Sequence, residues 1–222
     1  YENIAVGINI CEDIWIDDGP AEEQVAKGAS IILNINASPF DINKIDQRKE
    51  LVKGKAKKLN VPIVYLNMVG GQDELVFDGG SFVVDKNGEF IYVAPQFKED
   101  FFTFDIELEV TDNVSESSLS LNEKNIKIEP LLSSNNLNKT ESMYSALELG
   151  LSDYVTKNKF EKVLVGLSGG IDSALTATIA CDALSPENVI GVAMPSKYNP
   201  DSSLEDAKKL AKNLGIEIKE IN

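Results

Sequence analysis

The apolar positions of the first hundred residues fall into short continuous runs separated by longer amphipathic stretches. Short unbroken apolar runs are typical of strands buried on both faces, and apolar residues three or four apart are typical of helices. We therefore expect strands at residues 4–10, 30–36 and 61–69, with helices at 21–27 and 44–59.

From residue 80 the pattern changes to that of a β-hairpin. Residues 80–84 and 90–93 flank the turn sequence Asp-Lys-Asn-Gly at 85–88, and both Asn and Gly tolerate positive φ. A further strand is expected at 101–106, and Gly70-Gly71 is interpreted as a turn. Mixed strands and helices indicate layered α/β packing.

Between residues 107 and 139 the periodicity fades into a stretch rich in Ser, Asn and Glu. Such a composition is typical of a linker. We therefore divide the chain into a first domain at 1–110, a linker at 111–139 and a second domain at 140–222.

The second domain begins with a helical stripe and continues as β-α-β-α-β. The stripe consists of Met143, Leu147, Leu151, Tyr154 and Val155. Strands are expected at 163–167, 189–194 and 216–221, with helices at 173–184 and from Ser202, which opens a capping box, to Gly215. This order predicts parallel strands and right-handed crossovers. Three strands make only part of such a domain, so we expect further chain after residue 222.

Charge and the lack of histidine exclude several function classes. The chain has 222 residues, 36 acidic against 21 basic, and a net charge of -15. This charge repels nucleic-acid phosphates and anionic lipid, so we expect neither a nucleic-acid nor a membrane partner. There is no histidine, which excludes Ser-His-Asp and Cys-His catalytic sites and counts against a zinc site.

Two cysteines, Cys11 and Cys181, are too few for a disulfide framework and fit a reducing compartment. With no apolar run long enough to span a bilayer and no signal peptide before the first strand, we expect a cytoplasmic protein. Cys181 falls within an Ala-rich helix and is interpreted as core.

Cys11 is the candidate nucleophile of the first domain. It follows directly after the strand at 4–10, and a residue at the carboxyl end of a central strand faces a crevice. A thiolate there can attack an amide or nitrile carbon, with a carboxylate or lysine as the base. The alternative is that Cys11 is a small buried hydrophobe.

Two sequence blocks resemble a known family. Cys-Glu-Asp-x-Trp at 11–15 resembles the nucleophile block of the nitrilase-like amidases, and the block from Asn67 to Ser81 resembles the glutaminase domain of glutamine-dependent NAD synthetases. That family uses Glu, Lys and Cys without histidine, and Cys11 matches the nucleophile. Its Glu and Lys precede the cysteine block, so the resemblance implies a slice truncated at both ends whose glutaminase activity alone is negligible.

Residues 38–44, Ser-Pro-Phe-Asp-Ile-Asn-Lys, resemble the glutamine-binding segment of the same family. The resemblance implies that Ser38 and Lys44 hold the amino-acid end of glutamine, and a hydroxyl and an ammonium suit an α-carboxylate. Taken alone, Ser38 reads as a turn or cap residue and Lys44 as a solvated charge at a helix start.

The second domain contains a strand, a glycine loop and a helix in succession, with the loop Ser-Gly-Gly-Ile-Asp-Ser at 168–173. Backbone N–H groups at a helix N-terminus, approached through glycines, form an anion cradle. The alternative is a capped Gly-Gly turn, in which Asp172 is simply an N-terminal helix charge.

This loop resembles the pyrophosphate loop of the ATP pyrophosphatases. The resemblance implies that Asp172 helps to hold Mg²⁺ and that ATP is bound by a set that includes a residue after the next strand. The set is Gly166, Leu167, Ser168, Gly169, Gly170, Ile171, Asp172, Ser173 and Met194.

Together the resemblances imply an α/β chain: the C-terminal half of a nitrilase-like α-β-β-α sandwich, then the first β-α-β-α-β part of a Rossmann-like ATP pyrophosphatase domain. They imply a ligase that uses glutamine, ATP and deamido-NAD to make NAD, and a homo-oligomer. GMP synthetase is a rival, but its glutaminase needs a histidine. A stand-alone amidase with a non-catalytic appended domain, or a non-catalytic fragment, is the remaining alternative.

Overall fold

The computed structural model describes residues 4–106, 108, 137–195 and 201–221. The chain divides into two compact units. One contains Tyr1–Gly70 and Phe77–Ser142, and the other contains Gly71–Val76 and Met143–Asn222. Of the expected linker at 111–139, only residues 137–139 lie within the described part.

The first unit is built on a five-stranded mixed sheet in the order β1-β2-β3-β6-β7. The strands are β1 (Ala5–Ile10), β2 (Ala29–Asn36), β3 (Ile63–Asn67), β6 (Phe82–Val84) and β7 (Phe90–Val93). The first three run parallel, whereas β6 is antiparallel to both β3 and β7. The strands expected at 4–10, 30–36, 61–69, 80–84 and 90–93 and the hairpin turn at 85–88 are confirmed.

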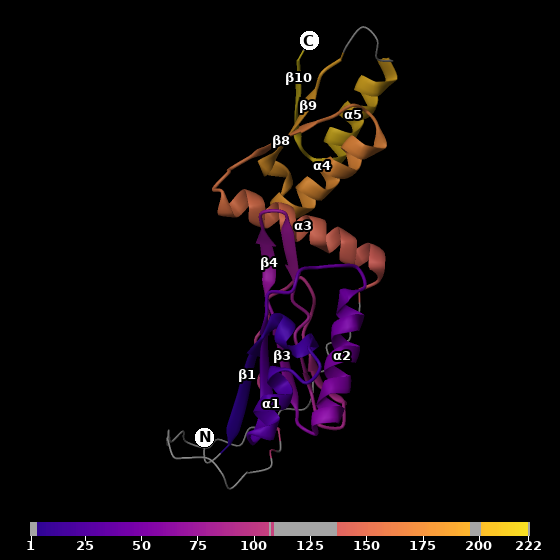
Figure 1. Ribbon diagram of the computed structural model, residues 1–222. Helices are drawn as coiled ribbons and strands as arrows, with labels where there is room; N and C mark the ends of the chain where they lie inside the picture. Colours follow the sequence, from indigo (N-terminus) through magenta and orange to yellow (C-terminus); the bar gives the residue numbers. More distant parts are fainter. Residues whose placement is uncertain (1–3, 107, 109–136, 196–200, 222) are drawn as a thin grey trace. The chain divides into compact units, whose positions relative to one another are not determined.

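Helices of the first unit pack against one face of this sheet (Figure 1). They are the short 3-10 helix η1 (Cys11–Trp15), α1 (Pro20–Ala26) and α2 (Lys44–Leu59). Pro20 starts α1 because its fixed φ suits the first helical position. Asn60 ends α2 in a left-handed conformation, with φ of 55°. Both expected helices are confirmed.

The opposite face of the sheet is apolar and exposed. It presents Val6, Ile8, Ile10, Ile35 and Leu66, each about half exposed or more. The expectation that the strand at 4–10 is buried on both faces is therefore wrong for the described residues, because helices cover only one face. A helical layer on one face and a bare apolar face on the other form one half of an α-β-β-α sandwich.

The second unit contains three parallel strands in the order β10-β9-β8. The strands are β8 (Val163–Gly166), β9 (Val189–Ala193) and β10 (Glu217–Glu220), and the helices between them are α4 (Ile171–Leu184), the short η2 (Pro186–Asn188) and α5 (Asp201–Leu214). Figure 1 shows α4 and α5 beside these strands. The predicted β-α-β-α-β order is confirmed.

Small side chains allow α4 and α5 to pack closely on this sheet. Ala177, Ala180, Cys181, Ala207 and Ala211 are all buried in its core, which confirms the interpretation of Cys181. The helix α5 begins at Asp201, so Ser202 lies in its first turn and does not precede it as a cap, contrary to expectation.

The second unit also includes α3 (Lys139–Lys157) from Met143 onward and the tip of a hairpin formed by β4 (Val69–Gln72) and β5 (Leu75–Asp78). The turn prediction for Gly70-Gly71 is wrong, because both glycines lie in β4. The chain turns instead at Asp73, with φ of 51°. The main-chain N–H of Gly71 donates to Asp153 of α3 at 2.6 Å, and Lys157 donates to the Gly71 carbonyl at 2.6 Å.

Two further expectations need correction. Residues 101–106 form neither a strand nor a helix. The predicted apolar stripe of α3 is only partly buried, because Val155 is in the interior whereas Met143, Leu147 and Tyr154 are about half exposed. Within the described part of the chain, no helix has both the length and the apolar character needed to cross a bilayer.

Candidate functional site: a strand-end thiol and a glycine loop

Cys11 lies on a tight elbow at the carboxyl end of β1. Its φ of 47° is left-handed, and the chain turns there from β1 directly into η1. The carboxylate of Asp13 accepts a hydrogen bond from the N–H of Ile10 at 2.8 Å, which holds the first turn of η1. Cys11 is partly exposed and forms no disulfide. The elbow thus presents a free thiol beyond the end of the strand.

A row of buried asparagines lies next to this elbow. The Asn34 amide donates to Asn9 at 2.7 Å and reaches the Cys11 carbonyl at 3.5 Å. The Asn36 amide in turn donates to the side-chain oxygen of Asn34 at 2.8 Å. Tyr65 on β3 is directly opposite Asn34 in the parallel register. The carboxyl ends of β1, β2 and β3 therefore meet at a polar surface on the helix-covered face.

Two atoms of this polar surface have no hydrogen-bond partner among the described residues, Asn9 Nδ2 and Asn36 Oδ1, and the Tyr65 hydroxyl lies beside the Ser38 hydroxyl. Tyr65 is fully buried, and burial raises the pKa of its hydroxyl to about 12. The phenol is therefore protonated at neutral pH. Because unpaired buried polar groups are costly, the two unpaired amide atoms leave hydrogen-bonding capacity for a polar molecule beside Cys11.

Ser38 follows β2 and is held by a second buried network. Arg48 of α2 donates to the Ser38 hydroxyl from Nε at 3.2 Å and from Nη2 at 3.0 Å, and Nη2 also donates to the Ser38 carbonyl at 2.9 Å. The other side of the guanidinium donates to Asp78 at 2.7 Å. Ser38, Arg48 and Asp78 are all buried. Sequence analysis identified Ser38 but missed Arg48 and Asp78.

Lys44, the other predicted glutamine-binding residue, is the first residue of α2 and is partly buried. Its ammonium lies 4.4 Å from the centre of the Trp15 ring, at the end of the short helix that Cys11 begins. Cys11 is thus linked to Lys44 through η1, which begins at Cys11 and ends at Trp15. Lys44 is linked to Ser38 through α2, which begins at Lys44 and contains Arg48. No direct contact joins any two of the three predicted residues in the described structure.

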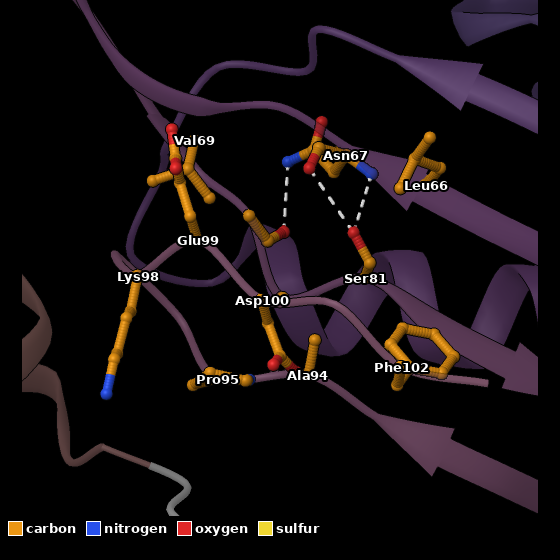
Figure 2. A pocket seen from close by; sticks show the side chains of 12 residues that line it. Leu66, Asn67, Val69, Ser81, Ala94, Pro95, Lys98, Glu99, Asp100 and Phe102 are labelled. Carbon is orange, nitrogen blue, oxygen red and sulfur yellow. Dashed lines mark hydrogen bonds between the residues drawn. The ribbon is translucent and has the colours of Figure 1, made fainter.

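A pocket of about 260 Å³ lies beside Asn67 (Figure 2), whose side-chain oxygen accepts a hydrogen bond from the Ser38 N–H at 2.9 Å. Asn67 and Ser81 line it and are hydrogen-bonded to each other, the Asn67 N–H to the Ser81 hydroxyl at 2.9 Å. Gly79 and Gly80, each with φ of 62°, form part of its wall. None of the predicted site residues lines this pocket.

The glycine loop of the second unit connects β8 to α4. Its two serine hydroxyls lie 3.1 Å apart, and the Ser173 hydroxyl donates to the Gly170 carbonyl at 2.9 Å. Ser168 to Asp172 are exposed, and Asp172 lies in the first turn of α4. The loop is therefore shaped by its own hydroxyls and leaves the helix N-terminus open to an anion.

Gly169 lets this loop approach α5 closely. Its φ is 81°, and a Cβ added to it would lie only 2.4 Å from the backbone oxygen of Ser203. Met194, which follows β9, is exposed and lies against Gly166. Leu167 differs from the rest of the predicted ATP-binding set because its side chain belongs to the core.

Comparisons with known proteins match the two parts of the chain to two different family models. Residues 2–116 match the family model for carbon-nitrogen hydrolases, which is more than half of the chain. The chain belongs to the carbon-nitrogen hydrolase family. Residues 143–222 match the family model for NAD synthase. The strand-end thiol thus lies in the carbon-nitrogen hydrolase region and the glycine loop in the NAD synthase region.

Relatives match almost the whole chain. A glutamine-dependent NAD(+) synthetase of Thermotoga maritima is 46% identical over 234 residues, which cover 97% of this chain and 40% of the relative. One from Synechocystis sp. is 40% identical and covers 97% of this chain and 38% of the relative. The chain therefore spans about 40% of the length of these relatives.

Two solved structures share the fold. A glutamine-dependent NAD+ synthetase from Acinetobacter baumannii, in complex with adenosine diphosphate, matches with a TM-score of 0.83 and 37% identity, over 100% of this chain and 40% of that chain. One from Cytophaga hutchinsonii has a TM-score of 0.69 at 20% identity over 97% of this chain and 38% of that chain, and supports the fold alone.

Proposed function

We propose that this chain contributes glutaminase and ATP-binding residues to a glutamine-dependent NAD synthetase. The observation that carries the proposal is the presence of two different sites in one chain. A free thiol stands on a strand-end elbow in a carbon-nitrogen hydrolase region, and an open glycine loop precedes a helix in an NAD synthase region. Each site suits one half-reaction.

The first half-reaction is the release of ammonia from glutamine. The Cys11 sulfur attacks the side-chain amide carbon, the C–N bond breaks, and the thiol proton passes to the departing nitrogen, which leaves as ammonia while a thioester forms. Water then hydrolyses the thioester to glutamate and regenerates the thiol. Ser38 and Lys44 are proposed to bind the amino-acid end of glutamine, which fixes its amide at Cys11.

The second half-reaction uses ATP to activate deamido-NAD. Its carboxylate attacks the α-phosphorus, pyrophosphate leaves, and ammonia displaces AMP from the adenylated carboxyl group to give NAD. The loop from Ser168 to Ser173 is proposed to bind the departing pyrophosphate through its backbone N–H groups and hydroxyls. Gly166 and Met194 flank the loop and are proposed to contact the nucleotide.

Mg²⁺ fits this loop as a partner of the phosphates. Asp172 offers an exposed carboxylate at the start of α4, and the neighbouring donors are serine oxygens. The described residues contain no group of three or more metal-binding side chains, so the phosphates would complete the coordination. Mg²⁺ is commonly held in this way, by one or two carboxylates and substrate phosphates, and it neutralises phosphate charge when bound.

Two further features belong to the proposal. Both cysteines are free, which suits the reducing cytoplasm where we place the protein. The family resemblance is also the basis for proposing a homo-oligomer.

The test is the Cys11→Ala variant of the full-length protein that contains this chain. NAD formation from deamido-NAD and ATP is measured first with glutamine and then with ammonium. The proposal predicts loss of the glutamine-driven reaction and retention of the ammonium-driven one. Retained glutamine activity would remove Cys11 as the nucleophile, and loss of both activities in a folded protein would contradict the two-site proposal.

A further inference from the structure

Arg48 is the sole arginine in a chain with 21 basic residues, and it is fully buried. A buried charge must be compensated by an opposite charge and by hydrogen bonds. A lysine at this position would supply a point charge, whereas an arginine supplies a planar group of several N–H donors. The location of the single guanidinium therefore indicates that its geometry is needed there.

The guanidinium is directed at the Ser38 segment. Nε and Nη2 both donate to the Ser38 hydroxyl, and Nη2 also donates to the carbonyls of Ser38 at 2.9 Å and of Pro39 at 2.8 Å. Nη1 is bound to Asp78, whose second oxygen accepts from Gln96 at 3.1 Å. The positive charge is thus neutralised within the protein, and all three guanidinium nitrogens donate to protein atoms.

These contacts determine what the Ser38 hydroxyl can do. A serine hydroxyl has one hydrogen to donate and an oxygen that accepts. Because the oxygen already accepts from Arg48, the hydrogen must point away from the guanidinium. Ser38 is therefore prepared to donate to a negative group such as a carboxylate, and it cannot readily accept from an ammonium.

We infer that Arg48 is a positioning residue that makes Ser38 a hydrogen-bond donor, so that the site selects amides bearing an α-carboxylate. The inference rests on the proposed function, in which Ser38 binds the amino-acid end of glutamine. Arg48 acts only through Ser38 and does not touch the substrate.

The experiment compares two amides in the full-length protein. Glutamine has the α-carboxylate, and γ-aminobutyramide is the same molecule without it. The readout is kcat/KM for ammonia release, with ammonium-driven NAD synthesis as a check that the protein is folded. The Arg48→Lys variant should lower kcat/KM for glutamine about tenfold to a hundredfold, mainly through KM, as expected for a weakened hydrogen bond to a charged group. The value for γ-aminobutyramide should not change.

A second variant distinguishes loss of the Ser38 contact from misfolding of the protein. The double variant Arg48→Gln with Asp78→Asn removes both buried charges together and so avoids a lone buried charge. It should show the same selective loss. The matched control is Lys55→Gln with Glu22→Gln, which removes another ion pair of α2, at 2.7 Å, that has no contact with Ser38. Its preference for glutamine over γ-aminobutyramide should equal that of the wild type.

Several outcomes would overturn the inference. One is an unchanged preference in both Arg48 variants while Ser38→Ala loses it, and another is an equal loss for both amides. Failure of the proposed function would look different. In that case the wild type would release no ammonia from glutamine, or the Cys11→Ala variant would still release it.

Discussion

Cys11 adopts a left-handed backbone conformation that costs a non-glycine residue about 1–2 kcal/mol. Such strain persists only where the surroundings hold it, and strained residues often cluster at functional sites. Here Asp13 fixes the start of η1 and Asn34 reaches the Cys11 carbonyl. The cost is consistent with a thiol that must project from the end of β1 at a set angle.

Gly169 should be the less replaceable of the two loop glycines. The Gly169→Ala change places a Cβ 2.4 Å from the Ser203 backbone oxygen in a left-handed conformation, which costs about 1–2 kcal/mol before any clash. The control is Gly170→Ala, because φ at Gly170 is -91° and the nearest atom to its Cβ is 3.4 Å away. Urea unfolding should show a clearly larger loss of stability for Gly169→Ala. Equal losses would contradict the described loop.

Asp172 should be needed whichever nitrogen source is used. The Asp172→Ala change should weaken Mg²⁺-dependent pyrophosphate binding about tenfold or more, because a charge-assisted contact is lost. NAD synthesis should fall with both glutamine and ammonium. The control is Glu187→Ala, which changes the net charge equally but lies after the far end of α4. Calorimetric titration of pyrophosphate measures the effect, and equal affinity in the two variants would remove Asp172 from the site.

Sequence alone predicted the thiol and the glycine loop as site residues, but it did not predict Arg48 and Asp78, which form the buried network around Ser38. Ser38 and Lys44 came from a family resemblance, and their roles remain predictions. Arg48 was not predicted as a site residue because it lies in a lysine-rich helix, and lysine-rich helices are usually exposed to solvent. Its burial depends on Asp78, thirty residues away, which local periodicity does not indicate. The one feature of the sequence that could have indicated a special role is that Arg48 is the sole arginine of the chain.

At the scale of elements, α1 and α2 are joined by a largely buried ion pair. Lys55 of α2 is only 4% exposed and donates to Glu22 of α1 at 2.7 Å, and it also donates to the Ile16 carbonyl at 2.6 Å. Burial alone would raise the pKa of Glu22, but the hydrogen bond and charge of Lys55 outweigh it and hold that pKa below its usual 4.5. The pair therefore stabilises the contact between the two helices.

The Glu22→Gln change should lower the free energy of unfolding by about 1–3 kcal/mol at pH 7, because Lys55 loses its charged partner. Since the pKa of Glu22 is lower in the folded state, the stabilisation is present above pH 4.5 and is lost as pH falls through the folded value. The difference between wild type and variant should thus shrink on acidification. A difference that is constant or grows as pH falls would contradict the assignment.

Elements were predicted accurately where neighbouring residues in the sequence determine the structure. The bounds of α2 matched the expected 44–59, since apolar spacing and the left-handed Asn60 act within the segment. The β4–β5 hairpin was missed because Gly70-Gly71 resembles a turn, whereas Gly71 packs closely on α3, where an added Cβ would lie 3.1 Å from the Gly150 Cα. Contacts of that kind depend on distant residues. The exposed apolar face of β1 was not predicted for the same reason, because its exposure depends on which distant elements cover the sheet.

At the scale of the whole molecule, the chain joins two units with different folds, and the two parts of the chain match different family models. Its net charge of -15 disfavours anions in general, so the proposed anion binding at the glycine loop would rely on local N–H groups and the proposed metal ion. The carbon-nitrogen hydrolase unit requires neither ATP nor a metal for its proposed step. The central claim is therefore that nitrogen released at Cys11 is the nitrogen that enters NAD.

Isotope competition tests this claim most directly. The full-length protein is given glutamine labelled with ¹⁵N in its side-chain amide, an equal concentration of unlabelled ammonium, ATP and deamido-NAD. Mass spectrometry then measures the label in the carboxamide of NAD. Wild type should incorporate ¹⁵N, whereas the Cys11→Ala variant should still make NAD but without label. Labelled NAD from the Cys11→Ala variant, or NAD entirely without label from the wild type, would contradict the account.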